Sequence, residues 1–249
     1  MTLRVLRVGN SNDLAGKLPD EARAWKIAAD MFAAATGEPV ETILKRAWPN
    51  EAFPGIVEGW MNEYRPDLVV LQVNNFWYGH ASTPLWLERR FGRAGKAVGG
   101  TGLAISRKKW FVEGRVSVLA SRALLRVLPS ATFFPVEEVG ERMEQAMRKV
   151  LAHEGVVLLV RGNERWAKLP MSTKRVNDRN LRLNEAMSST MRTICDRLRV
   201  PYFQRPLVEE HELRDFLDDA RWHNGEKGER VIGEYDGQAM IDAWKATRV

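Results

Sequence analysis

Cysteine is almost absent from this chain: its 249 residues include only Cys195, so no disulfide can form within it, and the apolar helical pattern around Cys195 predicts a small core residue. Histidine is scarce, and His80, His153 and His211 lack the spacing of a metal site. No apolar run approaches the roughly 20 residues of a membrane-spanning helix, and the charged start from Met1 to Arg7 is unlike a signal peptide. We therefore expect a cytoplasmic protein without a bound metal.

Positive charge is confined to one part of the sequence. Lysine and arginine total 38 against 32 acidic residues, which gives a net charge of +6. Between Glu88 and Arg126 there are ten basic residues and only two acidic ones, so the rest of the chain is slightly acidic. The high isoelectric point, about 9.6, is thus the property of a single segment.

Apolar runs and helical patterns alternate along the chain outside this basic segment. Strands are predicted at residues 3–8, 68–73, 156–160 and 200–203. Helices are predicted within residues 19–37, 55–64, 139–151, 183–198 and 231–244. Such alternation predicts an α/β fold in which helices cover both faces of a parallel sheet. The length suits one domain, so we expect a single domain over residues 1–249.

A serine follows the first predicted strand. The sequence Gly9-Asn10-Ser11-Asn12 comes directly after residues 3–8, which puts Ser11 at the carboxyl end of a strand. Open α/β sheets bind their ligands at that end. Ser11 is therefore a candidate nucleophile; the other interpretation is an ordinary turn, since Gly, Asn and Ser are common turn residues.

A histidine preceded by carboxylates lies near the other end of the chain. His223 follows Asp218 and Asp219 and comes just before the last predicted helix. A histidine can take the proton of a serine nucleophile, and a carboxylate can hold the imidazole in the required tautomer. We expect His223 to be the base and Asp219 its orienting partner, with Asp218 as the alternative. The competing interpretation of His223 is a surface residue at a helix N-terminus.

Together these segments resemble the SGNH, or GDSL-like, hydrolases. Gly9-Asn10-Ser11 is similar to the Gly-Asp-Ser block after the first strand of that family, and Val73-Asn74-Asn75 to a later block that carries an asparagine. Asp219 to His223, followed by Asn224 and Gly228, is similar to the Asp-x-x-His block before the last helix. The resemblance implies a flavodoxin-like three-layer sandwich with a parallel sheet. It also implies a Ser-His-Asp triad that needs no cofactor.

The same resemblance implies an oxyanion hole. The Ser11 backbone N–H and the Asn74 side chain would donate to the oxyanion, with Asn75 as the alternative to Asn74. Asn74 and Asn75 also fit a strand cap or an Asx-turn. A further backbone donor would come from the region of Ala47 and Trp48 or from Gly55.

Three details depart from the family pattern. Asn10 stands where the family has aspartate, no glycine precedes Asn74 in its block, and Asp219 is one residue further from His223 than the family spacing. These departures leave open a relative that keeps the fold and binds an ester or sugar without cleaving it.

The function implied by the resemblance is hydrolysis of a carboxylic ester, such as an acyl or acetyl ester. The substrate would be a small molecule or an acylated one, and the sequence does not choose among lipids, acetylated sugars and metabolites. An acyltransferase would use the same Ser11, since only the acceptor differs.

The middle of the chain, about residues 76–130, is expected to form a helical basic insertion or lid. Its aromatic side chains either line an acyl pocket or form a small core of their own. They are Phe76, Trp77, Tyr78, Trp86, Phe91, Trp110 and Phe111. A different class of function is also open, because cations among aromatics suit anionic lipid or nucleic acid, and residues 116–128 suit an amphipathic surface helix. No nucleic-acid motif is present, so we expect no nucleic-acid partner and at most weak contact with an anionic membrane.

Overall fold

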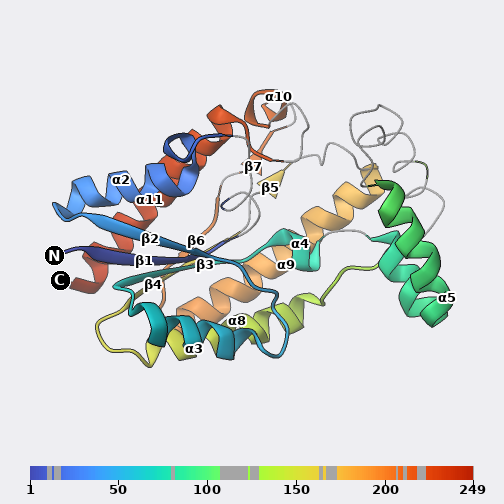
Figure 1. The fold of residues 1–249 in the computed structure, drawn as a ribbon, viewed down its shortest axis with the longest axis horizontal. Helices are drawn as coiled ribbons and strands as arrows, with labels where there is room; N and C mark the ends of the chain where they lie inside the picture. The colour runs from blue at the N-terminus through green and yellow to red at the C-terminus, as the bar shows by residue number, and fades with distance from the viewer. Residues whose placement is uncertain are drawn as a thin grey trace.

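A computed structural model shows a parallel sheet held between two layers of helices (Figure 1). The structure describes residues 1–9, 13, 18–79, 82–106, 123, 129–162, 165–166, 173–205, 207–209, 212–217 and 223–248. This architecture confirms the α/β class predicted from the sequence.

Five parallel strands form the sheet, in the order β2-β1-β3-β4-β6. Their bounds are β1 Leu3–Val8, β2 Val40–Lys45, β3 Leu68–Gln72, β4 Val157–Arg161 and β6 Tyr202–Phe203. Two further short strands, β5 Arg165–Trp166 and β7 Leu207–Val208, pair with each other in parallel. All four predicted strands are present. Of the five strands in the sheet, the sequence pattern missed β2, which lies at the sheet edge and is only partly buried; it also missed the short β5 and β7.

Helices cover both faces of the sheet. In chain order they are η1 Asp20–Ala22, α2 Ala24–Thr36, α3 Phe53–Tyr64, α4 Asn75–Tyr78, α5 Thr83–Ser106, α8 Val136–Leu151, α9 Lys174–Leu198, α10 Leu213–Phe216 and α11 Glu226–Arg248. In Figure 1, α2 and α11 lie above the sheet, whereas α3, α8 and α9 lie below it. None of the helices within the described residues is long and apolar enough to cross a membrane.

Alternate residues of each strand feed two separate apolar cores. Leu3 and Val5 of β1 face α2 and α11, where they pack with Phe32 and Met240. The opposite face, under α3, α8 and α9, contains the larger core and includes Cys195. Cys195 is fully buried, as its sequence context predicted, and burial raises the pKa of its thiol to about 12.

The first predicted helix is interrupted at its start. Residues 20–22 form a short 3-10 turn, and α2 begins only at Ala24 after the extended Arg23. The helix ends where the sequence predicted, at Gly37, whose φ of 73° is in the left-handed region that glycine adopts without strain.

The strand order contains a switch point, where consecutive connections leave the sheet in opposite directions. After β1 the chain adds β2 on one side and then β3 on the other. This order corresponds to that of flavodoxin-like sheets, in which ligands bind at the carboxyl ends of the first and third strands. The segments after β1 and β3 are therefore expected to border the site.

The basic segment belongs to an excursion from the sheet, residues 82–131, whose two ends are hydrogen-bonded to each other. Ser82 and Ala131 exchange two backbone hydrogen bonds of 2.9 and 3.1 Å. Between them α5 extends away from the sheet and is kinked at Gly92, which has φ 57° (Figure 1). Residues 107–122 and 124–128, which include most of the predicted amphipathic helix, lie outside the described residues.

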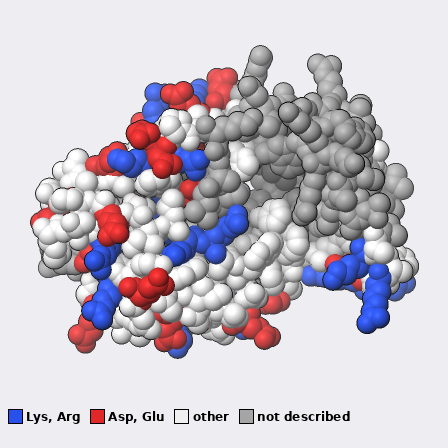
Figure 2. Space-filling model, viewed as in Figure 1, with Lys and Arg blue, Asp and Glu red and all other residues white. Residues whose placement is uncertain are grey.

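The described basic side chains of this excursion face solvent. They are Arg89, Arg90, Arg93 and Lys96. Figure 2 shows lysine and arginine gathered at the α5 end of the molecule. Trp77 and Tyr78 behave differently, because they are buried in the main core and the Tyr78 hydroxyl donates to Asn184 Oδ1 of α9 at 2.7 Å.

Candidate active site

The first edge of the site is the end of β1. Gly9 continues the strand, since its N–H donates to the Lys45 carbonyl at 2.9 Å. The proposed nucleophile Ser11 lies outside the described residues, as do Asn10 and Asn12. Asp13 is described and buried, and its carboxylate lies directly against Gly9. A Cβ on Gly9 would be 1.7 Å from Asp13 Oδ2, so this approach requires glycine.

Asn74 stands at the carboxyl end of β3. It caps the short helix α4, and its Oδ1 accepts a hydrogen bond from the Phe76 N–H at 2.9 Å. This is the Asx arrangement that the sequence left open. Of the described residues, none accepts a hydrogen bond from Asn74 Nδ2. The cap therefore fixes the amide while leaving its donor for another group.

Asn75, the alternative, directs its side chain toward the helix layer. A Cβ built on Gly79 would be 1.8 Å from Asn75 Oδ1 and 2.4 Å from Asn180 Oδ1, so the two amides meet at Gly79. Asn180 belongs to α9 and is 1% exposed. This placement favours Asn74 over Asn75 as the donor at the sheet edge.

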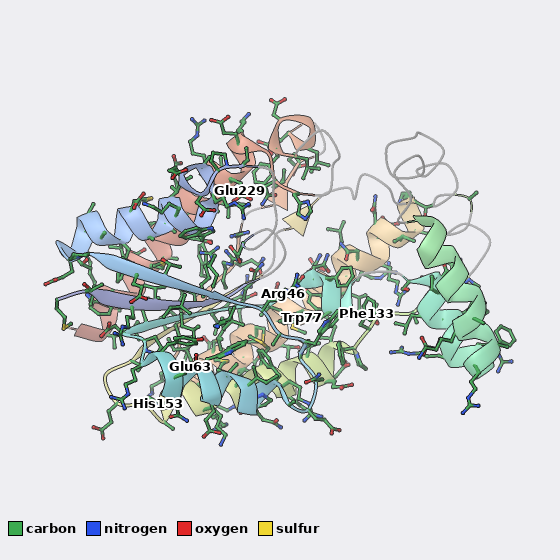
Figure 3. All side chains as sticks on the ribbon, viewed as in Figure 1. Arg46, Glu63, Trp77, Phe133, His153 and Glu229 are labelled. Atoms are coloured by element: carbon green, nitrogen blue, oxygen red, sulfur yellow. The ribbon has the colours of Figure 1, made fainter. Side chains whose placement is uncertain are left out.

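Four aromatic rings lie together around Phe76, which bonds to Asn74, and we call them the aromatic cluster: Trp48, Phe76, Phe133 and Phe134. The Trp48 ring centroid is 5.8 Å from that of Phe76 and 5.1 Å from that of Phe133. Trp48 is 44% exposed and Phe76 43%. Figure 3 shows Trp77 and Phe133 beyond the ends of the strands, and the Phe134 N–H donates to the Trp77 carbonyl at 2.9 Å.

The same cluster locates the loop after β2. Ala47 packs on the main core, and Trp48 contacts Phe76, which is two residues beyond Asn74. The Ala47 and Trp48 backbone is thereby held near the end of β3. Gly55 lies instead in the first turn of α3. Of the three donors left open by the sequence, Ala47 and Trp48 have the closer connection to Asn74.

His223 lies three residues before α11, next to the point where two segments of the chain bond to each other. Leu217 and Asn224 form an antiparallel bridge, and the Gly225 N–H donates to the Phe216 carbonyl at 2.9 Å. Both candidate carboxylates, Asp218 and Asp219, lie between these anchors and outside the described residues.

Glu229 connects this end of α11 to α2. One carboxylate oxygen accepts from Asn224 Nδ2 at 3.2 Å, and the other accepts from the Ala24 N–H at 2.7 Å. The second bond places a negative charge at the amino end of α2, where helix dipoles favour anions. Figure 3 shows Glu229 above the sheet, near the amino end of α11.

The direction of α11 sets the side of the sheet on which His223 lies. Met240 and Ile241 pack with Leu3, at the amino end of β1, whereas Asp236 bonds to Arg7, near its carboxyl end. The helix therefore runs antiparallel to β1, and its amino end points toward the carboxyl edge. His223 and Asn74 are thus on the same side of the molecule.

Five fully buried charged residues lie beneath this edge, and we call them the ionic cluster: Arg7, Asp13, Arg161, Arg205 and Asp236. Arg7 Nε donates to Asp13 Oδ1 at 3.0 Å, and Arg7 Nη2 donates to Asp236 Oδ2 at 2.6 Å. Arg205 Nη2 is 3.0 and 2.9 Å from the two Asp236 oxygens. Arg161 Nη1 also donates to Asp236, so this carboxylate accepts hydrogen bonds from three guanidinium groups.

Electrostatics within the ionic cluster keeps both carboxylates ionised. Burial alone would raise the pKa of Asp13, but attraction to Arg7 and then to Arg161 outweighs it and lowers the pKa. For Asp236 the same effect of burial is outweighed by the three guanidiniums, and its pKa is lowered far below the ordinary value. Burial and the neighbouring Arg205 lower the pKa of Arg161.

The sequence interpretation missed this cluster. The sequence feature that could have indicated it is a charged residue at a core position of a strand. Arg7 follows Leu3 and Val5 at two-residue spacing and therefore lies on the same strand face as these apolar residues. A charge at a core position of a strand implies a buried partner, because an isolated buried charge is costly. Nothing nearby in the sequence identified Asp236, which is 229 residues away from Arg7.

No family model and no curated protein sequence matches this chain. Solved structures match it along nearly its whole length. The esterase EstA from a Pseudoalteromonas species is similar over 98% of both chains, with 13% identity and a TM-score of 0.54. TesA is similar over 96% of this chain and 99% of its own, with 12% identity and a TM-score of 0.56.

A third solved structure is Est24, a carbohydrate acetylesterase from Sinorhizobium meliloti. It is similar over 98% of this chain and 99% of its own, with 13% identity and a TM-score of 0.51. At such identities the likeness concerns the fold. This chain has the α/β fold of the SGNH, or GDSL-like, hydrolases, as the resemblance of its motifs implied.

Proposed function

We propose that this protein hydrolyses a carboxylic ester, with Ser11 as the nucleophile, His223 as its base and Asp219 as the carboxylate that orients the imidazole. The observation that carries the proposal is the position of Asn74. It follows β3 at the point where the flavodoxin-like strand order favours ligand binding, with its amide held by the Phe76 N–H. The esterase structures that share the fold support the same reaction class.

The reaction is acyl transfer in two steps. His223 takes the Ser11 hydroxyl proton as the serine oxygen attacks the ester carbonyl, which becomes a tetrahedral oxyanion. The C–O bond to the alcohol then breaks, and the alcohol leaves with the proton from His223. A water molecule, deprotonated by His223, attacks the acyl-serine to give a second tetrahedral oxyanion; the acyl C–O bond to Ser11 then breaks, His223 returns the proton to the serine oxygen, and the acid is released.

Asn74 Nδ2 and the Ser11 backbone N–H would stabilise the oxyanion in both steps. Donors aimed at the developing charge lower the barrier because they need no reorientation during the reaction. The backbone near Ala47 and Trp48 is the favoured source of a further donor, since Trp48 packs against Phe76 beside Asn74.

The aromatic cluster would contact the substrate. Trp48 and Phe76 are more than two-fifths exposed although they are large apolar residues, and Phe76, on which Trp48 packs, bonds to Asn74. An apolar acyl or alcohol group would cover this surface and gain from its removal from water. We therefore assign the substrate to small or acylated esters with an apolar portion.

The test is covalent labelling with a fluorophosphonate, located by peptide mass spectrometry. Wild type is compared with Ser11→Ala, His223→Ala and the matched control Ser189→Ala, an exposed serine of α9. The expected result is one labelled serine, Ser11, with labelling lost in the first two variants and kept in the control. Labelling elsewhere, or none in folded wild-type protein, would reject the proposal and favour a fold that binds without cleaving.

A further inference from the structure

The face of the sheet that packs on α11 changes character toward the ends of its strands. Earlier positions on this face are apolar, as in Leu3 and Val5 of β1 and Val157 of β4. The last inward positions are polar on three adjacent strands, with Arg7 on β1, Gln72 on β3 and Arg161 on β4. Gln72 and Arg161 are cross-strand neighbours, and Arg161 Nη2 donates to Gln72 Oε1.

Asp236 joins these strand ends to α11. Its carboxylate is 2% exposed and accepts from Arg7 of β1 and Arg161 of β4. Arg205, just after β6, donates from Nη2 to both oxygens and from Nε to one of them at 3.3 Å, which makes a forked contact. One side chain therefore fixes α11 along its axis against the carboxyl ends of β1 and β4 and the segment just after β6.

Asp13 joins the segment after β1 to the same group of charges. Arg7 binds the Asp13 carboxylate through two nitrogens, at 3.0 and 2.9 Å, and Arg161 Nη2 lies 3.8 Å from its other oxygen. Asp13 is two residues beyond Ser11, and α11 begins three residues beyond His223. Arg7 makes short contacts, at 2.9 and 2.6 Å, with both Asp13 and Asp236, so it directly links the two segments.

Stability by itself does not require such an arrangement. A buried ion pair recovers by attraction about what its groups lose by leaving water, and apolar residues of similar volume often stabilise a core better. What charged groups add is direction, because bidentate guanidinium–carboxylate contacts hold a fixed geometry. A nucleophile and a base that belong to different segments of the chain must be held in a fixed relative position to react.

We propose that the ionic cluster is a positioning device for the reaction: through Arg7 it holds the segment that carries Ser11 in a fixed relation to α11, and hence to His223. This inference rests on the proposed function. Asp13 and Asp236 are positioning residues, since they act through the segments to which they belong. Displacement of reacting groups by about 1 Å can lower a rate by about a hundredfold, so the expected effects are large.

The test measures the rate constant of Ser11 labelling by a fluorophosphonate, with kcat and KM for a chromogenic ester, well below the unfolding temperature. We expect Asp13→Asn and Asp236→Asn each to lower kcat and the labelling rate about 10- to 100-fold. KM should change by less than about threefold, because neither carboxylate is proposed to touch the substrate. The double variant should be about as slow as the slower single variant, because both act through Arg7.

A matched control separates positioning from lost stability. Phe32→Leu perturbs the core on the same sheet face, where Phe32 is fully buried with its ring edge-to-face with Trp244. It should lower the unfolding temperature and leave the labelling rate unchanged. If Asp13→Asn does not fold, Arg205→Lys offers a milder change that keeps the charge and loses the forked contact.

The outcomes distinguish the two proposals. Ser11 labelled equally fast in wild type and in cluster variants overturns the positioning role and leaves the ester hydrolase. The positioning role is also overturned if Phe32→Leu slows Ser11 labelling as much as a cluster variant that loses the same amount of stability. Folded wild-type protein that is not labelled overturns the proposed function, and this inference with it.

Discussion

Asparagine in place of Asp236 should destabilise the protein strongly. The change keeps the shape of the side chain but removes the negative charge that three guanidiniums share at 2% exposure. Removing one partner of a buried ion pair typically costs about 3–5 kcal/mol, because the other charge stays buried without compensation. For a domain of this size each kcal/mol shifts the unfolding temperature by about 2–4 °C, so we expect a fall of about 6–20 °C.

Thermal unfolding followed by circular dichroism at pH 7 measures this shift. Asp242→Asn is the matched control, since Asp242 lies on the same helix, is exposed and accepts a hydrogen bond from Gln238. It should change the unfolding temperature by no more than about 2 °C, as exposed substitutions usually do. A comparably small shift in Asp236→Asn would refute the assignment of Asp236 as the central anion of the ionic cluster.

The same variant should alter the dependence of stability on pH. The pKa values of Asp13 and Asp236 are lower in the folded state than in the unfolded state. Their contribution to stability is therefore full above the unfolded value of about 3.9 and is lost as the pH falls below it. We expect the gap in unfolding temperature between wild type and Asp236→Asn to narrow below about pH 4. If the difference in unfolding temperature stayed constant down to pH 3, the stabilisation would not come from the ionised Asp236 carboxylate.

Three further changes test the site and its surroundings. Asn74→Ala should lower kcat about 10²- to 10³-fold with little change in KM, whereas Asn75→Ala should not, as steady-state kinetics on one ester would show. Gly79→Ala should destabilise the fold by about 1–3 kcal/mol in urea unfolding, because its Cβ would be 1.8 Å from Asn75 Oδ1. Phe76→Ala should raise KM for aryl or long-chain esters more than for acetyl esters; equal effects on both would show that Phe76 does not contact the acyl group.

Strands and helices with strong local patterns were predictable from the sequence. The continuous apolar run of β3 is buried along its whole length, and α9 combines apolar spacing with an end at Leu198 that the pattern also indicated. β2 was missed because its pattern is that of an edge strand. Its residues are partly exposed, so no continuous apolar run marks it.

The position of the candidate site was also readable from local features. Asn74 follows a buried strand, and a parallel sheet brings the ends of its strands to one edge. Its capping contact with Phe76 is local and follows from the Asx preference for helix N-termini. Which of Asn74 and Asn75 faces the edge was not readable, since that depends on α9 and its Asn180.

The amino-acid sequence thus determined the class of fold, the order of its main elements and the strand ends at which chemistry is expected, because periodicity and turn chemistry act over a few residues. Only the tertiary structure decided how the charges pair. In the sequence, Arg7 is one of two charged residues in a strand of mostly apolar residues. Its partner Asp236 is a polar position of the last helix, 229 residues later. Their pairing follows from the stacking of α11 against the ends of β1 and β4, where a charge removed from water is retained only beside an opposite one.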